Sequence, residues 1–174
     1  DVTTLAGTAG QAGSADGSGS EARFNVPIGI AVDAGGNVYV SDMGNHTIRK
    51  ITAGGDVSTF AGLAGQSGSN DGTGAAARFN MPEGLAVDSS GNVYVAEYWD
   101  ATIRKITPEG VVTTFAGSAG QKGSVDGPAA TARFKSPMDV AIAPDGSLYV
   151  ADFLSCTIRR IAADGAVTTV AGTA

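Results

Sequence analysis

Three aspartates stand in glycine-rich stretches of the chain, each directly before a glycine: Asp16, Asp71 and Asp126. A carboxylate beside flexible backbone carbonyls can bind calcium, a cation that takes roughly six to eight oxygen ligands. One carboxylate per stretch is few, and the dense acidic spacing of a calcium loop is absent. We therefore expect no cofactor, with calcium as the alternative, and a structural role in which each aspartate accepts backbone N–H bonds or pairs with the arginine seven residues later. These arginines are Arg23, Arg78 and Arg133.

The remaining residue types offer little for catalysis. The chain has one cysteine, which excludes an internal disulfide framework and a zinc site made of several cysteines, and one histidine, which weakens any histidine-based metal site. The sequence contains no nucleophile elbow, no phosphate-cradling glycine loop and no cluster of histidines. These residues favour a protein that is not an enzyme and that has no catalytic residues.

A repeat of 55 residues organises the whole chain of 174 residues. The segment 2–7 returns at 57–62, 112–117 and 167–172, and residues 2–56 and 57–111 are identical at 33 of 55 positions without a gap. Such a period indicates a repeat architecture. We read residues 1–174 as one array made of a stub strand at 2–7 and three units at 8–62, 63–117 and 118–172.

Each unit contains four short segments with strand-like alternation, separated by turn residues. In the first unit they are strand A at Ile28–Asp33, strand B at Asn37–Asp42, strand C at Thr47–Thr52 and strand D at Asp56–Ala61. Four-stranded sheets at a fixed period are typical of β-propeller blades. The unit is longer than an ordinary blade, and the additional residues lie in the glycine-rich stretch Thr8–Glu21. This stretch reads either as a flexible linker or as an ordered loop, and the recurrence of its particular residues in all three units favours the loop.

The unit resembles the NHL repeat, a β-propeller family named for an Asn-His-Leu motif. The matching segments are Pro27–Asp33, Gly36–Asp42 and Asn45–Ile51, followed in the second unit by Pro82–Asp88 and Gly91–Val95. The leucine of the motif is Thr47 here, and Asn45-His46 is replaced by Asp100-Ala101 and Ser155-Cys156. The resemblance implies an all-β fold of NHL-type blades, with four-stranded antiparallel sheets: three blades and an extra N-terminal D strand. It also implies contacts to protein, RNA or glycan, or lyase or hydrolase chemistry.

Alternate connections of an up-and-down sheet fall at opposite ends, so the glycine-rich loops and the B-to-C loops share one face. The three units differ most in their B-to-C loops, and the large apolar residues there favour a contact surface. The alternative is that these residues pack under the neighbouring long loop. The candidate binding residues are Met43, Asn45, His46, Tyr98, Trp99, Asp100, Phe153 and Leu154.

Two further features could be taken for functional sites, but each favours a structural role. The pairs Arg49-Lys50, Arg104-Lys105 and Arg159-Arg160 hold six of the eleven basic residues. Adjacent strand residues point to opposite faces, and no aromatic residue alternates with them to stack bases, so we expect ion pairs between blades or solvated side chains. His46 and Cys156 occupy one repeat position two blades apart, which excludes a Cys–His dyad.

We expect a non-enzymatic bacterial propeller segment, extracellular or on the cell surface, that binds or builds a self-assembling scaffold. The alternatives are a metal-dependent lyase or hydrolase of the NHL type and a glycan- or other ligand-binding module. Its expected partner is itself, as a longer repeat array, a filament or a six-blade dimer, together with a protein or glycan ligand. The net charge of −6 disfavours nucleic acid, and no apolar run reaches the roughly 18 residues that span a membrane. Because the chain begins at Asp1, we expect an excerpt or a processed product.

Overall fold

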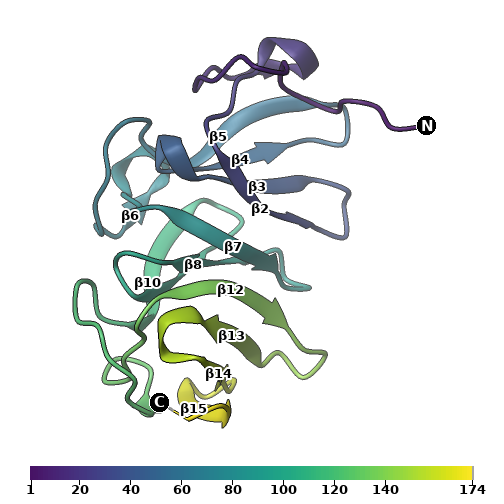
Figure 1. The fold of residues 1–174 in the computed structure, drawn as a ribbon. Helices are drawn as coiled ribbons and strands as arrows, with labels where there is room; N and C mark the ends of the chain where they lie inside the picture. The colour runs from purple at the N-terminus through teal and green to yellow at the C-terminus, as the bar shows by residue number, and fades with distance from the viewer. Residues whose placement is uncertain (174) are drawn as a thin grey trace.

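The computed structural model describes residues 1–173, which fold into three antiparallel sheets stacked one on the next (Figure 1). The first sheet has the order β1-β5-β4-β3-β2, with β1 (Gly17–Ser18), β2 (Pro27–Val32), β3 (Val38–Asp42), β4 (Thr47–Ile51) and β5 (Asp56–Gly62). The second has the order β6-β10-β9-β8-β7, with β6 (Gly72–Thr73), β7 (Pro82–Val87), β8 (Val93–Glu97), β9 (Thr102–Ile106) and β10 (Val111–Gly117). The third has the order β11-β15-β14-β13-β12, with β11 (Gly127–Pro128), β12 (Pro137–Ile142), β13 (Leu148–Asp152), β14 (Thr157–Ile161) and β15 (Ala166–Ala171).

Four short 3-10 helices complete the described chain: η1 (Gly19–Glu21), η2 (Met43–Asn45), η3 (Gly74–Ala76) and η4 (Phe153–Ser155). No helix within residues 1–173 has the length and apolar character needed to cross a bilayer.

The all-β fold of propeller-like blades is confirmed, and each predicted strand of the first unit lies within one residue of the observed bounds. Tight turns join these strands because glycine supplies a left-handed backbone there, as at Gly36 with φ of 80°. The expectation of four strands per sheet is corrected to five. Gly17 and Ser18 pair with Val57 and Asp56 of β5, so the glycine-rich stretch is an ordered loop that adds a short outer strand to its own sheet.

The extra D strand expected at residues 2–7 is wrong, since these residues form no strand. A D strand needs the free edge of a strand C, and the strand C of the first sheet, β4, already pairs along its length with β5. Gly7 nevertheless packs on the first blade, where its N–H donates to the carbonyl of Gly19 over 3.0 Å.

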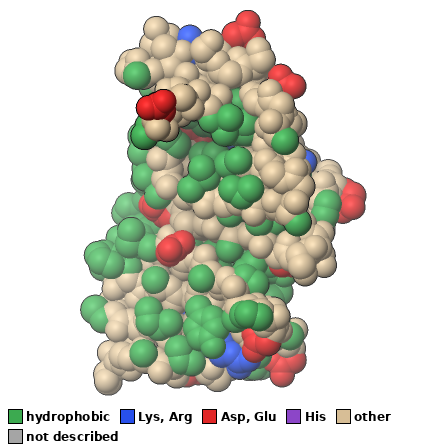
Figure 2. Space-filling model, turned by 90° about the vertical axis from the view of Figure 1, so that its right-hand side faces the viewer, with side chains coloured by type: hydrophobic (Ala, Val, Ile, Leu, Met, Phe, Trp, Pro, Cys, Tyr) green, Lys and Arg blue, Asp and Glu red, His purple; other side chains and the backbone are tan. Residues whose placement is uncertain are grey.

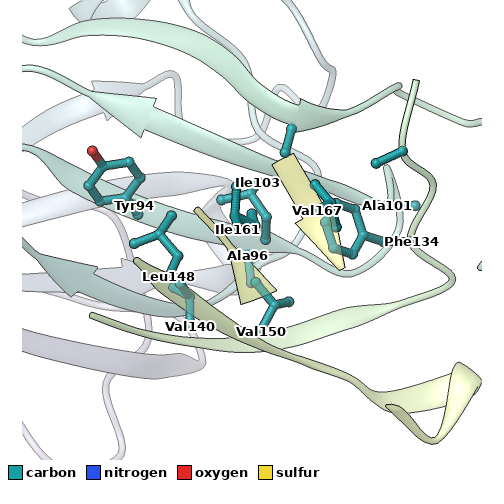
Figure 3. Close-up of a cluster of buried hydrophobic side chains, with 12 residues drawn as sticks. Tyr94, Ala96, Ala101, Ile103, Phe134, Val140, Leu148, Val150, Ile161 and Val167 are labelled. Carbon is teal, nitrogen blue, oxygen red and sulfur yellow. The ribbon is translucent and has the colours of Figure 1, made fainter. Parts of the chain in front are cut away.

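The hydrophobic core lies between the blades, because each sheet presents one alternating set of side chains to each neighbour. Figure 3 shows the cluster between the second and third blades, where Ile103 and Tyr94 of the second blade lie near Leu148, Val150 and Phe134 of the third. A matching cluster fills the space between the first and second blades.

The innermost strands β2, β7 and β12 lie side by side (Figure 1). Two glycines permit this approach. A Cβ on Gly84 of β7 would lie 2.6 Å from the Cα of Asp139, and a Cβ on Gly29 of β2 would lie 3.0 Å from the Cα of Gly84. Because those neighbours are backbone atoms, only glycine allows the inner strands to pack at this spacing.

Candidate functional site

One fully buried arginine in strand C holds each blade together. Arg104 donates from Nη1 to Glu97 Oε2 over 2.9 Å and from Nη2 to Asp71 Oδ1 over 2.7 Å. It also donates to the carbonyls of Arg78 and Asn70. These contacts compensate the burial of the charge at Nη1 and Nη2, while the buried Nε of Arg104 has no hydrogen-bond partner among the described residues. The equivalents in the first and third blades are Arg49 and Arg159.

Two predicted pairings are therefore wrong. Asp16 contacts Arg49 rather than Arg23, since the strand C side chain reaches the loop carboxylate from inside the blade. The expected ion pairs between blades are likewise replaced by pairs within a blade. The basic residue that follows the buried arginine makes another kind of contact. In the first blade, Lys50 Nζ lies 5.6 Å from the centre of the Tyr39 ring.

The arginines that lie seven residues after the loop aspartates bind their own loops instead. Arg78 donates from Nη1 to the carbonyls of Ala75 and Ala77 and from Nη2 to Gln66 Oε1. It thereby holds the end of its own loop. The structure thus places Arg23, Arg78 and Arg133 on loop carbonyls rather than on Asp16, Asp71 and Asp126.

Each loop aspartate forms an ion pair with the buried arginine of its own blade. Partial burial opposes ionisation of Asp126, but hydrogen bonds from Thr169 and the pair with Arg159 outweigh it and lower the pKa of that carboxyl. A calcium ion at this carboxylate would compete with the guanidinium. Within residues 1–173 no group of three His, Cys, Asp or Glu side chains is arranged to hold a metal ion.

The glycine-rich loops and the B-to-C loops meet at one end of the blades. Gly65 N–H donates to the carbonyl of Asn45 over 3.2 Å, and Gly120 N–H donates to that of Asp100 over 3.1 Å. The opposite face, with the tight turns, is the one that Figure 2 presents. Hydrophobic patches and scattered acidic side chains are visible there, with few basic ones.

The eight candidate binding residues separate into three groups in the structure. Asn45 and Asp100 are buried, so they are corrected from surface residues to internal ones. Asn45 donates from Nδ2 to the carbonyl of Gly13 and to Asp42 Oδ2, each over 2.7 Å, and Asp100 accepts from Asn80 Nδ2 over 2.8 Å.

A second group lies at the flanks of blades. His46 is half-buried at the seam with the second blade, where its Nδ1 is 3.4 Å from the backbone N of Met81. Met43, in the same loop, is also half-buried. Phe153 is exposed and borders a hollow beside Cys156 and Ile158 on the outer flank of the third blade.

In the third group, Leu154 lines a depression of about 310 Å³ on the loop face, and Tyr98 and Trp99 contact Lys122, another residue of its lining. Its lining residues are Lys122, Gly123, Ser124, Lys135, Leu154 and Ser155. The side chain of Trp99 is half exposed and meets Tyr98 edge to face at 5.5 Å between ring centres. The Lys122 Nζ lies 4.9 Å from the centre of the Trp99 ring, which joins the aromatic pair to the depression.

At this depression the third blade lacks a side-chain bridge that the first blade has. Asn45 of the first blade spans from its B-to-C loop to the glycine-rich loop at Gly13. The equivalent Ser155 is too short, and its Oγ bonds locally to the carbonyl of Asp152 and to Thr157 Oγ1. Ser155 therefore does not bridge the two loops, and both line the depression.

Lys122 and Lys135 were missed by reasoning from the sequence. Their repeat equivalents are Ala12 and Ser67 for the first and Asn25 and Asn80 for the second, so both lysines are particular to the third unit. That divergence from the other two units is the signal that the sequence offers for them. Of the four lysines in the chain, these two are exposed, and both line the depression.

Models of known families match one segment of each of the three units. The NHL repeat model matches residues 24–51 and 79–106, and the Teneurin NHL domain model matches residues 121–173. The human NHL repeat-containing protein 2 is 29% identical over 186 aligned positions, which cover 92% of this chain and 26% of the relative. The chain therefore spans about a quarter of the length of that relative.

Two solved structures show the same fold at low identity. An auxiliary nutrient binding protein from Bacteroides thetaiotaomicron superposes with a TM-score of 0.69 at 22% identity, over 80% of this chain and 36% of the other. A gluconolactonase from Xanthomonas campestris superposes with a TM-score of 0.63 at 17% identity, over 85% of this chain and 48% of the other. The same scaffold thus serves both binding proteins and enzymes.

Proposed function

Because the chain belongs to the NHL-repeat family of β-propeller proteins, we propose that it is a non-enzymatic binding module that recognises an acidic carbohydrate on its loop face. The fold alone does not choose a function, so the site must carry the argument. The observation that carries it is the convergence of Lys122 and Lys135, each particular to the third unit, on one depression beside the exposed Trp99.

Charge supports an anionic ligand. The chain carries a net charge of −6 and buries three of its arginines in internal ion pairs. Two exposed ammonium groups at one depression are therefore a local positive centre on an acidic molecule. Such a centre attracts an anion at short range, while the surrounding acidic surface disfavours large polyanions such as nucleic acid.

The aromatic pair supports a ligand with a flat apolar face. The exposed ring of Trp99 is held edge to face by Tyr98 and offers a rigid surface at little cost in side-chain entropy. A pyranose ring has an apolar face of axial C–H groups, and a uronic acid adds a carboxylate for the lysines. The depression is at the small end of ligand pockets, which span roughly 300–1,000 Å³, and this suits one or two sugar rings.

We place this activity outside the cell or at its surface, as befits a nutrient-directed binding protein. The composition supports this location, since the chain is rich in small residues, has a net charge of −6 and contains one cysteine. The fold shared with the nutrient binding protein of Bacteroides thetaiotaomicron also supports it.

Calorimetric titration with digalacturonate, and with neutral digalactose as the matched probe, tests the proposal. We expect binding of the acidic sugar only. Lys122→Gln and Lys135→Gln should each weaken it about tenfold or more, because a charge-assisted contact contributes roughly 1.5–3 kcal/mol. Trp99→Ala should also weaken it, because the sugar ring loses the aromatic surface on which it packs. The control is Lys105→Gln, whose Nζ lies over the Tyr94 ring outside the depression.

Several outcomes would overturn the proposal. Equal affinity for the two sugars would show that the lysines do not select the ligand. An equal loss of affinity in Lys105→Gln would show that only the net charge of the protein matters. Absence of binding to either probe would remove the carbohydrate assignment. Turnover of the acidic probe, seen as new reducing ends or an unsaturated product, would contradict the non-enzymatic assignment.

A further inference from the structure

The second blade carries two buried acids in and before its B-to-C loop, where the first blade carries an acid and an amide. In the first blade, Asn45 Nδ2 donates to Asp42 Oδ2 over 2.7 Å and so ties the end of the loop to its start. The equivalent residues of the second blade are Asp100 and Glu97. An ionised carboxylate only accepts hydrogen bonds, so this bridge lacks its donor unless a proton is bound there.

Both acids are removed from solvent. Glu97 is fully buried and Asp100 is 9% exposed. Asp100 Oδ1 accepts from Asn80 Nδ2 over 2.8 Å, whereas Asp100 Oδ2 is buried without a hydrogen-bond partner among the described residues. A buried polar atom without a partner destabilises the folded state. A proton held between the two carboxyls would supply the missing hydrogen bond.

The cations of the second blade compensate one of these charges but not both. Arg104 of β9 donates from Nη1 to Glu97, and its Nη2 is already paired with Asp71 of the glycine-rich loop. Arg78 of the same loop donates to loop carbonyls. Asp100 forms no ion pair within residues 1–173. Ionisation of both acids would therefore place two like charges in low-dielectric surroundings beside a single guanidinium.

The adjacent blades bring two further titratable groups to this region. From the third blade, Lys122 Nζ lies 5.4 Å from the centre of the Tyr98 ring. From the first blade, His46 Nδ1 lies 3.4 Å from the backbone N of Met81. Neither group forms an ion pair with the two acids in the structure.

The two acids flank the aromatic pair of the loop face. Tyr98 and Trp99 are the two residues between them in the chain, and their rings meet edge to face. The carbonyl of Asp100 accepts from the N–H of Gly120 in the third blade over 3.1 Å. Lys122 of that same loop lies 4.9 Å from the centre of the Trp99 ring and lines the depression. A change at the two acids is thereby linked to the ligand site.

We propose that Glu97 and Asp100 share one proton and form a pH-sensitive switch in the loop that carries Trp99. With the proton bound, the loop is closed and Trp99 stays beside Lys122. When the proton is released to solvent, the two buried negative charges repel each other, the loop opens toward water and Trp99 moves away from Lys122. The effect of the switch on ligand binding rests on the function proposed above, whereas the switch itself does not.

The pH at which the switch operates follows from the surroundings of Glu97. Burial raises the pKa of Glu97 to about 7, Arg104 opposes this rise, and the charge of Asp100 adds to it. Because the two carboxyls interact, the titration belongs to the pair. The loop is therefore closed below pH 7 and opens as the pH rises through 7.

Fluorescence tests the switch without a ligand, because Trp99 is the only tryptophan of the chain. The emission of the unaltered chain should shift to longer wavelength in one transition near pH 7. Asp100→Asn restores the amide donor of the first blade and should give the emission of the closed loop on both sides of that pH. The control is His46→Gln, which removes a group that ordinarily titrates near pH 6.5 and should leave the transition in place.

Infrared difference spectroscopy observes the proton itself. On raising the pH through 7, the unaltered chain should lose the C=O stretching band of a neutral carboxylic acid. Asp100→Asn should show no such loss, because Glu97 then accepts from an amide as Asp42 does in the first blade.

Calorimetric titration with digalacturonate at about pH 6 and about pH 8 tests the effect on the ligand site. Carboxylates and lysines with ordinary pKa values keep their charge across this range. The affinity of the unaltered chain should fall about tenfold, since only about a tenth of the molecules remain closed one pH unit above the midpoint. The affinity of Asp100→Asn should be the same at both pH values.

The outcomes separate the switch from the carbohydrate proposal. Emission that does not change with pH, a transition that persists in Asp100→Asn, or one that disappears in His46→Gln overturns the switch. Loss of the infrared band in Asp100→Asn also overturns it, because Glu97 would then hold the proton alone. Equal binding of digalacturonate by the unaltered chain at both pH values overturns the switch while the carbohydrate proposal stands. A transition that Asp100→Asn removes, without binding at either pH, supports the switch and contradicts the carbohydrate proposal.

Discussion

Arg104 Nη2 lies 2.7 Å from Asp71 Oδ1, although the two residues are 33 positions apart and belong to a strand and a loop. The strand C arginine thus fixes the glycine-rich loop that opens the same blade. Because Arg104 is buried while the Asp71 side chain is half exposed, the loop supplies the charge and the blade supplies the low-dielectric surroundings.

Asp71→Ala should lower the free energy of unfolding by about 1–3 kcal/mol, because a buried donor of Arg104 loses its charged partner. Urea denaturation measures this change. Glu109→Ala in an exposed turn is the control and should have little effect. An unchanged unfolding curve for Asp71→Ala would show that the loop is held by other contacts.

The pH dependence of stability should report Glu97. Burial raises the pKa of Glu97 to about 7 against the opposing influence of Arg104. The folded state then retains a proton that the unfolded state releases above pH 4.5. The contribution of Glu97 to stability is therefore full below pH 4.5 and is lost as the pH rises through 7, by no more than about 1.4 kcal/mol per pH unit.

Glu97→Gln removes this titration. The unfolding free energy of the unaltered chain should therefore fall relative to that of Glu97→Gln from pH 5 to pH 8. Parallel curves for the two proteins would show that Glu97 titrates alike in the folded and unfolded states.

Ser155→Asn should close the loop-face depression. An asparagine there can donate to the carbonyl of Gly123, as Asn45 donates to that of Gly13. We expect a gain of about 0.5–1.5 kcal/mol in unfolding free energy together with loss of ligand binding. Ser155→Ala, which leaves the depression open, should keep binding. Retained binding in Ser155→Asn would move the ligand away from this depression.

Gly84→Ala should destabilise the array by about 1–3 kcal/mol or more through overpacking. Its Cβ would meet the Asp139 backbone at 2.6 Å, so β7 and β12 would have to separate. Gly54→Ala is the matched control, since the nearest atom to its Cβ is 3.7 Å away. Thermal unfolding of the two variants compares them, and equal midpoints would contradict close packing of the inner strands.

The strands could be predicted from the sequence because their signals are local. Alternation over a few residues and glycines at turns place β2 to β5 without knowledge of the neighbours. The buried ion pairs could not be predicted in this way, because the partner of Asp16 lies 33 residues away on a strand with two adjacent basic residues. Arginine at 49, 104 and 159, beside a variable basic position, was the signal for the inward side chain.

The candidate site was predicted only in part. Tyr98, Trp99 and Leu154 stood out by their divergence between units, and in the structure Leu154 lines the depression while Tyr98 and Trp99 contact Lys122 of its lining. Asn45 and Asp100 diverge for a different reason, since each satisfies buried hydrogen bonds of its own blade. Divergence between repeats therefore identifies positions that the scaffold leaves free, but not whether a side chain points inward.

The two-residue strands β1, β6 and β11 have a consequence for solubility. Each covers the start of a longer strand D at the perimeter of its blade, where unpaired N–H and C=O groups would otherwise template growth of a neighbouring sheet. A short, glycine-containing edge is a poor template for amyloid-like stacking. The outer strands therefore protect the start of each strand D from pairing edge to edge with another molecule.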